Sequence, residues 1–428
     1  MLSRMEHDSI GALNVPAEAY YGVQSMRAAT NFQITHRPLH PVLIDSIVMV
    51  KKAAAITNEK SGKLDQQIAQ TIIQACDEIL DGNLRDQFIV DAIQGGAGTS
   101  ANMNANEVIA NRAIEILGGT KGDYSIVHPN DHVNMSQSTN DVIPTAGKIT
   151  VLKLLPQTIK ELEKLEKAME EKEAEFDDIL KMGRTQLQDA VPMRLGQSFG
   201  AFAHVLKRDI KRLKNVMDEM KVLNIGATAI GTAINVDPYY LANISYELSK
   251  VAGISLKQAD DLIDATQNLD GFVSVSGVLK TCAVDISKIS NDLRLMSSGP
   301  RTGLSEINLP ARQNGSSIMS GKINPVIPEV VSQVAYLIIG HDYTITMAAE
   351  AGQCEKYIEK SVGISTALCP YIGYAKSAEI AKKSLKTGIS VKELVLEEGL
   401  LKEEELKEIL KPEKMTQPMR EKVMKAVS

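Results

Sequence analysis

The chain has 428 residues, of which 44% are hydrophobic and 4% aromatic, and it contains no tryptophan. This length accommodates one large unit or about three domains with apolar cores. The formal net charge of −6 argues against a nucleic-acid partner, so an anionic small molecule must be attracted by a local cluster of cationic and N–H groups. No stretch approaches a membrane span, and the first residues lack the apolar block of a signal peptide, so we expect a cytoplasmic protein with no membrane partner.

The four cysteines, Cys76, Cys282, Cys354 and Cys369, lie far apart or in no metal-ligand spacing. This pattern is typical of reduced core thiols in a cytosolic protein. We therefore expect no metal site.

Two small, polar segments come first along the chain. Residues 95–104 (GGAGTSANMN) resemble a dinucleotide loop superficially, but their spacing is wrong for a Rossmann fingerprint and a helix is expected after Thr99. Residues 134–141 (NMSQSTND) end in a Ser-Thr-Asn-Asp cluster that fits a helix N-cap. Capping donors and anion-binding donors occupy the same place, so this cluster fits both a helix start and an anion site.

Apolar residues at helical spacing then predict three long helices. The stripes cover residues 155–176, 199–220 and 278–296. Each stripe marks one face of a helix, and ordinary core packing explains all of them. No cofactor site is needed to account for these residues.

The glycine-rich segment 315–325 (GSSIMSGKINP) lies between two helical patterns. Its glycines allow close backbone approach to a ligand, its adjacent hydroxyls offer a proton acceptor and a donor, and Lys322 with Asn324 can grip a carboxylate. A flexible connection between helices is the plain alternative. From the residues alone, Ser316 and Ser317 are equivalent candidates for the proton acceptor.

The segment 326–349 carries Glu329 and Asp342 as its only formal charges. A helix of this composition is apolar around most of its circumference. We therefore expect it at a bundle centre or at a subunit interface.

Four segments in order along the chain resemble the aspartase/fumarase superfamily. They are residues 95–104, 134–141, 182–192 (MGRTQLQDAVP) and 315–325, and the likeness extends from the PAEAYYG segment at 16–22 to the segment 298–310. The resemblance implies a mainly all-α fold, an elongated three-domain lyase built on a central long-helix bundle. It also implies a homotetramer whose active sites are shared between subunits.

Combined with the periodicity, this plan predicts three domains. They are an N-terminal mostly helical domain at 1–139, a central helical bundle at 140–353 and a small C-terminal helical domain at 354–428. The expected substrate is a small dicarboxylate, and the resemblance implies that no organic cofactor is used.

The resemblance implies roles in β-elimination. Such a reaction needs a base at Cβ, donors for the charge that develops on one carboxylate, and a grip on the other. Ser316 matches the family's base, and Ser317, Ser138 and Thr139 match residues around the carboxylate that becomes an enediolate-like dianion. A serine hydroxyl is a poor base unless its alkoxide is stabilised by positioned N–H groups and cations, which loop closure would supply.

The remaining motif residues match two other parts of the family's site. The positions that grip the α-carboxylate are Lys322, Asn324 and Thr185. The positions near the departing amine are Thr99, Asn140 and Gln186. His132 belongs to a segment that the family associates with a secondary anion site, so we leave it out of the catalytic set.

Residues around the motifs favour the aspartase branch, in which L-aspartate gives fumarate and ammonia. Gln186 stands where fumarases carry histidine, although some aspartases carry histidine there too. The segment 324–329 (NPVIPE) is also similar to the aspartase version. Hydration of fumarate is the alternative activity, and a non-catalytic binding homologue is the alternative of another class. Argininosuccinate and adenylosuccinate lyases fit less well.

The sequence departs from its family in two ways. Ser320 replaces the proline of the loop, which widens the ensemble of open loop conformations, and Ala233 replaces a glycine. After Gln353 the chain continues directly into the C-terminal pattern, a gap of about forty residues, the length of one long return helix and its turn. Either the protein lacks a bundle helix, or a segment of the natural chain is missing from this sequence.

Overall fold

A computed structural model describes residues 2–351, 362–411 and 415. By its contacts the chain divides into two compact units. The first unit comprises residues 1–150, 221–268 and 353–428, and the second comprises 151–220 and 269–352. The predicted domain limits at residues 139 and 353 stay a prediction, and Gln353 itself lies outside the described residues.

The first unit is mainly helical, with short strands. Its N-terminal elements are β1 (Ser3–Asp8), β2 (Gly11–Pro16), α1 (Val23–Asn31), α2 (Pro41–Lys60), α3 (Gln66–Leu80), η1 (Arg85–Gln87), α4 (Thr99–Ile116), η2 (Pro129–Val133) and the start of α5 (Thr139–Glu175). Its later elements are β5 (Val222–Leu223), α7 (Pro238–Ala252), β6 (Lys257–Gln258), α8 (Leu262–Gln267), η3 (Val362–Leu368), α11 (Cys369–Ile372), α12 (Tyr374–Thr387), α13 (Val391–Glu397) and α14 (Glu403–Ile409).

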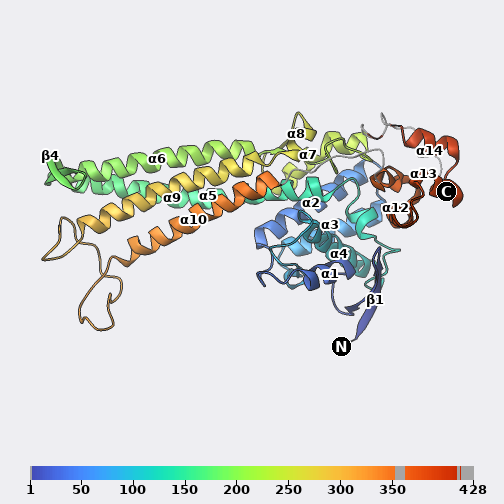
Figure 1. Cartoon of the computed structure of the whole chain (residues 1–428), viewed down its shortest axis with the longest axis horizontal. Helices are drawn as coiled ribbons and strands as arrows, with labels where there is room; N and C mark the ends of the chain where they lie inside the picture. The colour runs from blue at the N-terminus through green and yellow to red at the C-terminus, as the bar shows by residue number, and fades with distance from the viewer. Residues whose placement is uncertain (1, 352–361, 412–414, 416–428) are drawn as a thin grey trace. The chain divides into compact units, whose positions relative to one another are not determined.

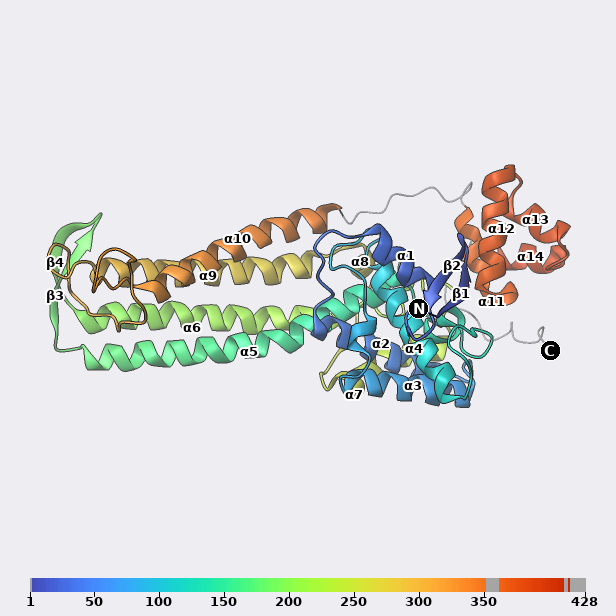
Figure 2. The ribbon, with the colours of Figure 1, turned by 90° about the horizontal axis from the view of Figure 1, so that it is seen from below.

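The second unit is a bundle of long helices with one hairpin. It contains the rest of α5, β3 (Leu180–Thr185), β4 (Gln188–Arg194), α6 (Leu195–Met220), α9 (Asp270–Met296) and α10 (Val326–Ala351). Helix α9 packs against both α6 and α10. Figures 1 and 2 show these helices running side by side, with the hairpin and the α9–α10 loop at the same end of the bundle. The predicted mainly all-α fold with long helices is confirmed.

Local sequence explains where several helices begin. Asp65 and Asp237 each accept two backbone N–H bonds at the first turns of α3 and α7. At the start of α5 two side chains share this role. Asp141 Oδ1 accepts from Ser138 N at 2.8 Å, and Ser138 Oγ accepts from Asn140 N at 3.3 Å. Helix α7 ends at Gly253 in the left-handed conformation.

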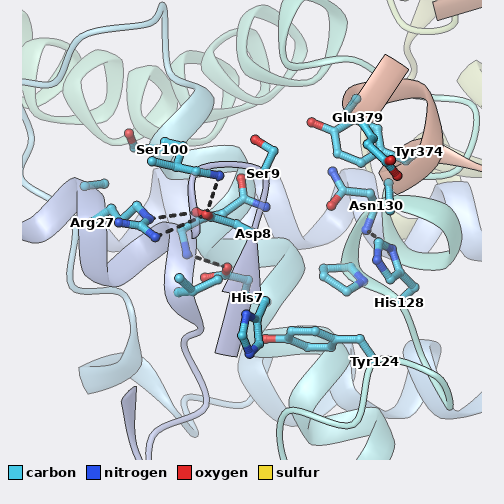
Figure 3. A pocket seen from close by; sticks show the side chains of 18 of the residues that line it. His7, Asp8, Ser9, Arg27, Ser100, Tyr124, His128, Asn130, Tyr374 and Glu379 are labelled. Carbon is cyan, nitrogen blue, oxygen red and sulfur yellow. Dashed lines mark hydrogen bonds and ion pairs between the residues drawn. The ribbon is translucent and has the colours of Figure 1, made fainter. Parts of the chain in front are cut away.

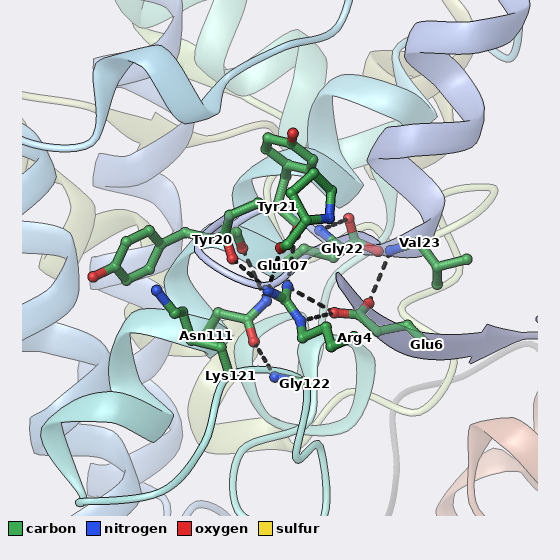
Figure 4. A network of polar contacts seen from close by, with 12 residues as sticks. Arg4, Glu6, Tyr20, Tyr21, Gly22, Val23, Glu107, Asn111, Lys121 and Gly122 are labelled. Atoms are coloured by element: carbon green, nitrogen blue, oxygen red, sulfur yellow. Dashed lines mark hydrogen bonds and ion pairs between the residues drawn. The ribbon is translucent and has the colours of Figure 1, made fainter. Parts of the chain in front are cut away.

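A polar network ties the N-terminal segment to α4 (Figure 4). Arg4 donates to Glu6 and to four backbone carbonyls of residues 16–21, and Glu6 accepts from Val23 N and Tyr124 Oη, each at 2.9 Å. The buried carboxylate of Glu107 accepts N–H groups from the first turn of α1. A Cβ at Gly22 would come within 2.6 Å of Glu6 and 2.8 Å of Glu107, so only glycine fits between the two carboxylates.

The environment of α10 bears on one of the two places expected for it. Within the chain only Ser332, Ala335 and Asp342 of this helix are buried, and large side chains such as Tyr336, Leu337 and Met347 are exposed. A bundle-centre position within one chain is therefore wrong. Tight packing reaches only the side that faces α9, where Asp342 accepts from Ser276 Oγ and Lys280 Nζ.

Ala233, which stands at a family glycine position, has φ 53° and is buried, so the backbone there has the left-handed conformation that glycine adopts most easily. Among the described residues, no helix is both long and apolar enough to cross a membrane.

Candidate active site

The glycine-rich loop connects α9 to α10 and is closed at its base. Gly315 N donates to Lys322 O at 2.7 Å, and Asn324 Nδ2 donates back to Gly315 O at 3.1 Å. These bonds bring the two ends of the loop together. Lys322 is exposed, whereas Asn324 is half-buried beside Gly315.

Ser316 lies just inside this closure. Its Oγ accepts hydrogen bonds from the backbone N–H groups of Ile318 and Met319, at 3.3 and 3.0 Å. Two N–H dipoles pointing at one hydroxyl oxygen stabilise negative charge on that oxygen. These contacts distinguish Ser316 from the exposed Ser317, which the residues alone did not.

The β3–β4 hairpin carries Thr185 and Gln186. Its register pairs Thr185 with Gln188, and the two turn residues between them, Gln186 and Leu187, have φ values of 52° and 64°. This is the backbone of a tight two-residue hairpin turn, and it leaves Thr185 and Gln186 exposed at the tip. No sequence pattern had predicted this hairpin.

A charge cluster joins the hairpin to the α9–α10 connection within the second unit. Arg184 donates to both carboxylate oxygens of Glu306, at 3.1 and 2.5 Å, and Lys181 Nζ lies 3.1 Å from Glu306. The Arg184 hydrogen bond is the main cause that lowers the pKa of Glu306. Glu306 thus fastens the strand that ends in Thr185 to the segment that leads into the Ser316 loop.

The other predicted residues belong to the first unit. Thr99 opens α4 and donates its hydroxyl to Gly96 O at 2.7 Å, and Ser138, Thr139 and Asn140 open α5. Asn102 of α4 donates to Thr139 Oγ1 at 3.3 Å, so the two helix starts meet. Both meanings predicted for the Ser-Thr-Asn-Asp cluster remain compatible, because it does cap α5.

Asp141 links the start of α5 to the segment 226–228. Its Oδ2 accepts from Gly226 N at 3.1 Å and from Thr228 N at 3.0 Å, and it is fully buried. Asn140 adds a bond from its Nδ2 to Ala229 O at 2.8 Å. Burial raises the pKa of Asp141 to about 6, against the lowering effect of these N–H donors. The residues 226–229 thereby support the predicted carboxylate-binding segment, a role that no local sequence signal indicated.

The predicted site residues therefore form two groups. Thr99, Ser138, Thr139 and Asn140 belong to the first unit, and the remaining residues, Thr185, Gln186, Ser316, Ser317, Lys322 and Asn324, belong to the second. In the first unit the Asn102–Thr139 bond joins the starts of α4 and α5, and in the second unit Glu306 joins the hairpin to the α9–α10 connection. The assignment of a complete site stays a prediction.

A cavity of about 580 Å³ lies elsewhere in the first unit (Figure 3). Its lining includes His7, Arg27 paired with Asp8, His128 and Tyr374, but none of the predicted site residues. Among the described residues, no group of three or more His, Cys, Asp or Glu side chains is arranged to hold a metal ion. The predicted site residues offer hydroxyl, amide and lysine groups.

Comparison with known proteins identifies the family. A family model described as Lyase matches residues 11–340, and one described as the fumarase C C-terminus matches residues 364–417. The chain belongs to the aspartase/fumarase superfamily and is an enzyme of the lyase class.

Individual relatives match over nearly the whole length. An aspartate ammonia-lyase from a Bacillus species is 49% identical over 97% of this chain and 98% of its own, and the Escherichia coli aspartate ammonia-lyase is 45% identical over 97% and 96%. A solved structure titled fumarate lyase:delta crystallin from Brucella melitensis, bound to cobalt, has a TM-score of 0.81 at 46% identity and covers 97% of this chain and 100% of its own. A class II fumarase from Schistosoma mansoni has a TM-score of 0.79 at 32% identity, covering 97% and 99%.

These alignments also contain positions that the chain lacks. The alignment with the Bacillus protein has 457 positions but takes in 97% of only 428 residues, so about forty positions have no residue here. Neither family model covers residues 341–363. That interval contains the place where the sequence pattern jumps to the C-terminal segment.

Proposed function

We propose that this protein is an aspartate ammonia-lyase, which converts L-aspartate into fumarate and ammonia. The observation that carries the proposal is the likeness to aspartate ammonia-lyases at 45–49% identity over 97% of the chain. The proposed substrate class is a small dicarboxylate.

Ser316 is the proposed base. The Ser316 alkoxide takes the proton from Cβ of aspartate, the electron pair moves into the neighbouring carboxylate, and an enediolate-like dianion forms. That dianion collapses with cleavage of the Cα–N bond, so that ammonia leaves and the double bond of fumarate remains. The N–H groups of Ile318 and Met319 support this role, because each donates to Ser316 Oγ.

The other residues are proposed to bind the three ends of the substrate. Ser317, Ser138 and Thr139 donate to the carboxylate that gains charge, and their hydroxyls act most strongly on the intermediate. The residues proposed for the α-carboxylate are Lys322, Asn324 and Thr185. The residues proposed near the amine are Thr99, Asn140 and Gln186.

A homotetramer with active sites shared between subunits is proposed as the working assembly. Two observations support it: the predicted site residues are divided between two units of the chain, and α10 leaves large apolar side chains exposed. A contiguous apolar face of this kind is covered in stable proteins, and a symmetric assembly covers it with a second copy. The proposed reaction needs no organic cofactor, and we place it in the cytoplasm, where cysteines such as Cys76 and Cys282 stay reduced.

The test is to follow fumarate absorbance with the purified full chain. We expect fumarate to form from L-aspartate and not from L-malate at a comparable rate. Preference for L-malate would assign the alternative function, fumarate hydratase, for which the solved fumarase structure at 32% identity is the favouring observation. An intact oligomer without activity on any dicarboxylate of the family would instead indicate a non-catalytic homologue.

A further inference from the structure

A lysine is buried beneath the segment that leads into α5. Lys51 of α2 is completely buried. Its Nζ donates to Asn134 Oδ1 at 2.8 Å and to Gln137 Oε1 at 3.0 Å. Among the described residues no carboxylate lies within ion-pair distance of it. Placing an ammonium group in the interior without a direct counter-ion costs folding free energy. A residue that served only for packing would therefore not need to be a lysine.

The two acceptors of Lys51 belong to one tight turn, residues 134–137, that ends directly at Ser138. Asn134 Nδ2 donates to Gln137 O at 3.2 Å, and Gln137 Nε2 donates to Val133 O and Met135 O. The lysine therefore contacts the two side chains that hold this turn together. Asn102 completes the connection, because its Nδ2 donates both to Asn134 Oδ1 and to Thr139 Oγ1.

We propose that Lys51 is a positioning residue for the dicarboxylate site. It fixes the 134–137 turn that precedes Ser138 and Thr139. It also supplies, behind this turn, the positive charge that a bound carboxylate requires. The inference rests on the proposed function, in which Ser138 and Thr139 take the carboxylate that gains negative charge. Lys51 acts through Asn134 and Gln137 and does not touch the substrate.

Charges around Lys51 fit this role. The ionisable groups near it are Asp141 at the start of α5 and the thiol of Cys76 on α3, and Tyr240 of α7 faces Asp141 in turn. Burial raises the pKa of the Cys76 thiol well above its usual range, so this group stays neutral. Burial lowers the pKa of Lys51 to about 7, and the carboxylate of Asp141 opposes that lowering. The ammonium is thus easily lost in the free protein, and an anion bound above it favours its protonation.

The first test is a pair of neighbouring lysines. Lys51→Met keeps an unbranched side chain one atom shorter and removes the charge and the donor. We expect kcat/KM for L-aspartate to fall about 10- to 100-fold, the range for loss of a charged hydrogen bond. Lys52→Met is the matched control, because Lys52 is on the same helix but pairs with Asp77 of α3. We expect that variant to stay within about twofold of wild type.

The second test measures protons. Succinate, a dicarboxylate without a leaving group, is titrated into the full-length protein at pH 8 by calorimetry in two buffers of different ionisation heat. We expect wild type and Lys52→Met to take up protons on binding, because the bound anion returns the ammonium to Lys51. Lys51→Met is expected to take up fewer, with any remainder belonging to Asp141. A merely structural lysine would not change proton uptake.

The outcomes are separable. Wild type that forms no fumarate from L-aspartate overturns the proposed function, whereas active wild type with unchanged kcat/KM in Lys51→Met overturns only this inference. A variant that melts at lower temperature but keeps kcat, KM and proton uptake also overturns it. If Lys51→Met does not fold, Gln137→Leu replaces it, because this variant keeps the lysine and removes one of its two acceptors. Unchanged kcat/KM in Gln137→Leu rejects the positioning role. Absence of proton uptake by wild type also rejects it.

Discussion

The closure of the glycine-rich loop at Gly315 gives the sharpest test of the proposed site. A Cβ added at this glycine would lie 2.7 Å from Cγ and Oδ1 of Asn324 and 2.8 Å from its backbone nitrogen. Ordinary contact begins near 3.4 Å, so the Asn324 side chain must retreat by about 0.7 Å and its 3.1 Å bond to Gly315 O is lost.

The expected effect on catalysis follows from that displacement. A misplacement of about 1 Å costs on the order of 100-fold in rate, so Gly315→Ala should lower kcat/KM for L-aspartate about 10- to 100-fold, or about 1.4 to 2.7 kcal/mol. The melting temperature should change little, because the loop is largely exposed.

Gly277→Ala is the control for this prediction. Gly277 lies within α9, where a Cβ would meet nothing within 4 Å. That variant should keep its kcat/KM and gain up to about 1 kcal/mol of stability from the better helix propensity of alanine. Steady-state kinetics and thermal unfolding of both variants decide the question. Full activity in Gly315→Ala would refute the placement of Asn324 at the α-carboxylate.

The remaining predictions are tested by kinetics, acid unfolding, sedimentation and mass measurement. Ser316→Ala should abolish turnover while succinate still binds, whereas Lys322→Ala should weaken binding as well; a Ser316→Ala enzyme that keeps its rate, with Ser317→Ala inactive, would reverse the assignment of the base. Glu306→Gln should loosen the hairpin that carries Thr185 and lower kcat/KM. Because Arg184 lowers the pKa of Glu306, this carboxylate stabilises the fold above its unfolded pKa of about 4.5 and loses that effect as pH falls through the folded value. Acid unfolding of Glu306→Gln should therefore be less steep than that of wild type, and equal slopes would argue against the ion pair. Sedimentation should give a tetramer, and a stable monomer that does not aggregate would contradict the assembly. The intact mass should be 46.5 kDa, and an excess equal to about forty residues would show that the natural chain contains the segment its relatives carry.

Helical periodicity predicted the scaffold better than any other signal. The stripes at 199–220 and 278–296 lie within α6 and α9, and the stripe at 155–176 lies in α5 except for its last residue. Helix α5 begins 16 residues before its stripe and α9 begins eight residues before its own, so the stripes located the helices better than their starts. Their apolar side chains repeat at helical spacing and pack on one face, so the pattern is contained in the local sequence. The β3–β4 hairpin was missed because most of its residues are exposed and show no alternation of buried and exposed side chains.

The residues of the candidate site also differ in whether a local sequence pattern predicts them. The motifs point to the loop that carries Ser316, Ser317, Lys322 and Asn324, because a small-residue loop with a lysine and an amide is a local signal. The choice of Ser316 over Ser317 came from the family resemblance. Supporting residues such as Lys51, Asp141 and Glu306 act through contacts with segments distant in the chain, which no local pattern encodes. For Lys51 the local signal was weak. The largely apolar run 47–56 contains both Lys51 and Lys52, and only Lys51 is buried.

The long-range bonds of Asp141 also impose an order on synthesis. Its partners Gly226 and Thr228 follow it by 85 and 87 positions, after the chain has gone out along α5 and returned along α6. At about 5 to 20 residues per second, the ribosome needs roughly 4 to 17 s to cover that distance. During this interval the nascent start of α5 has its own cap but not the two N–H groups that hold its carboxylate. The predicted carboxylate-binding segment is therefore completed late, by a part of the chain that carries none of the predicted site residues. A chain that stops before residue 226 lacks both N–H donors to Asp141 Oδ2.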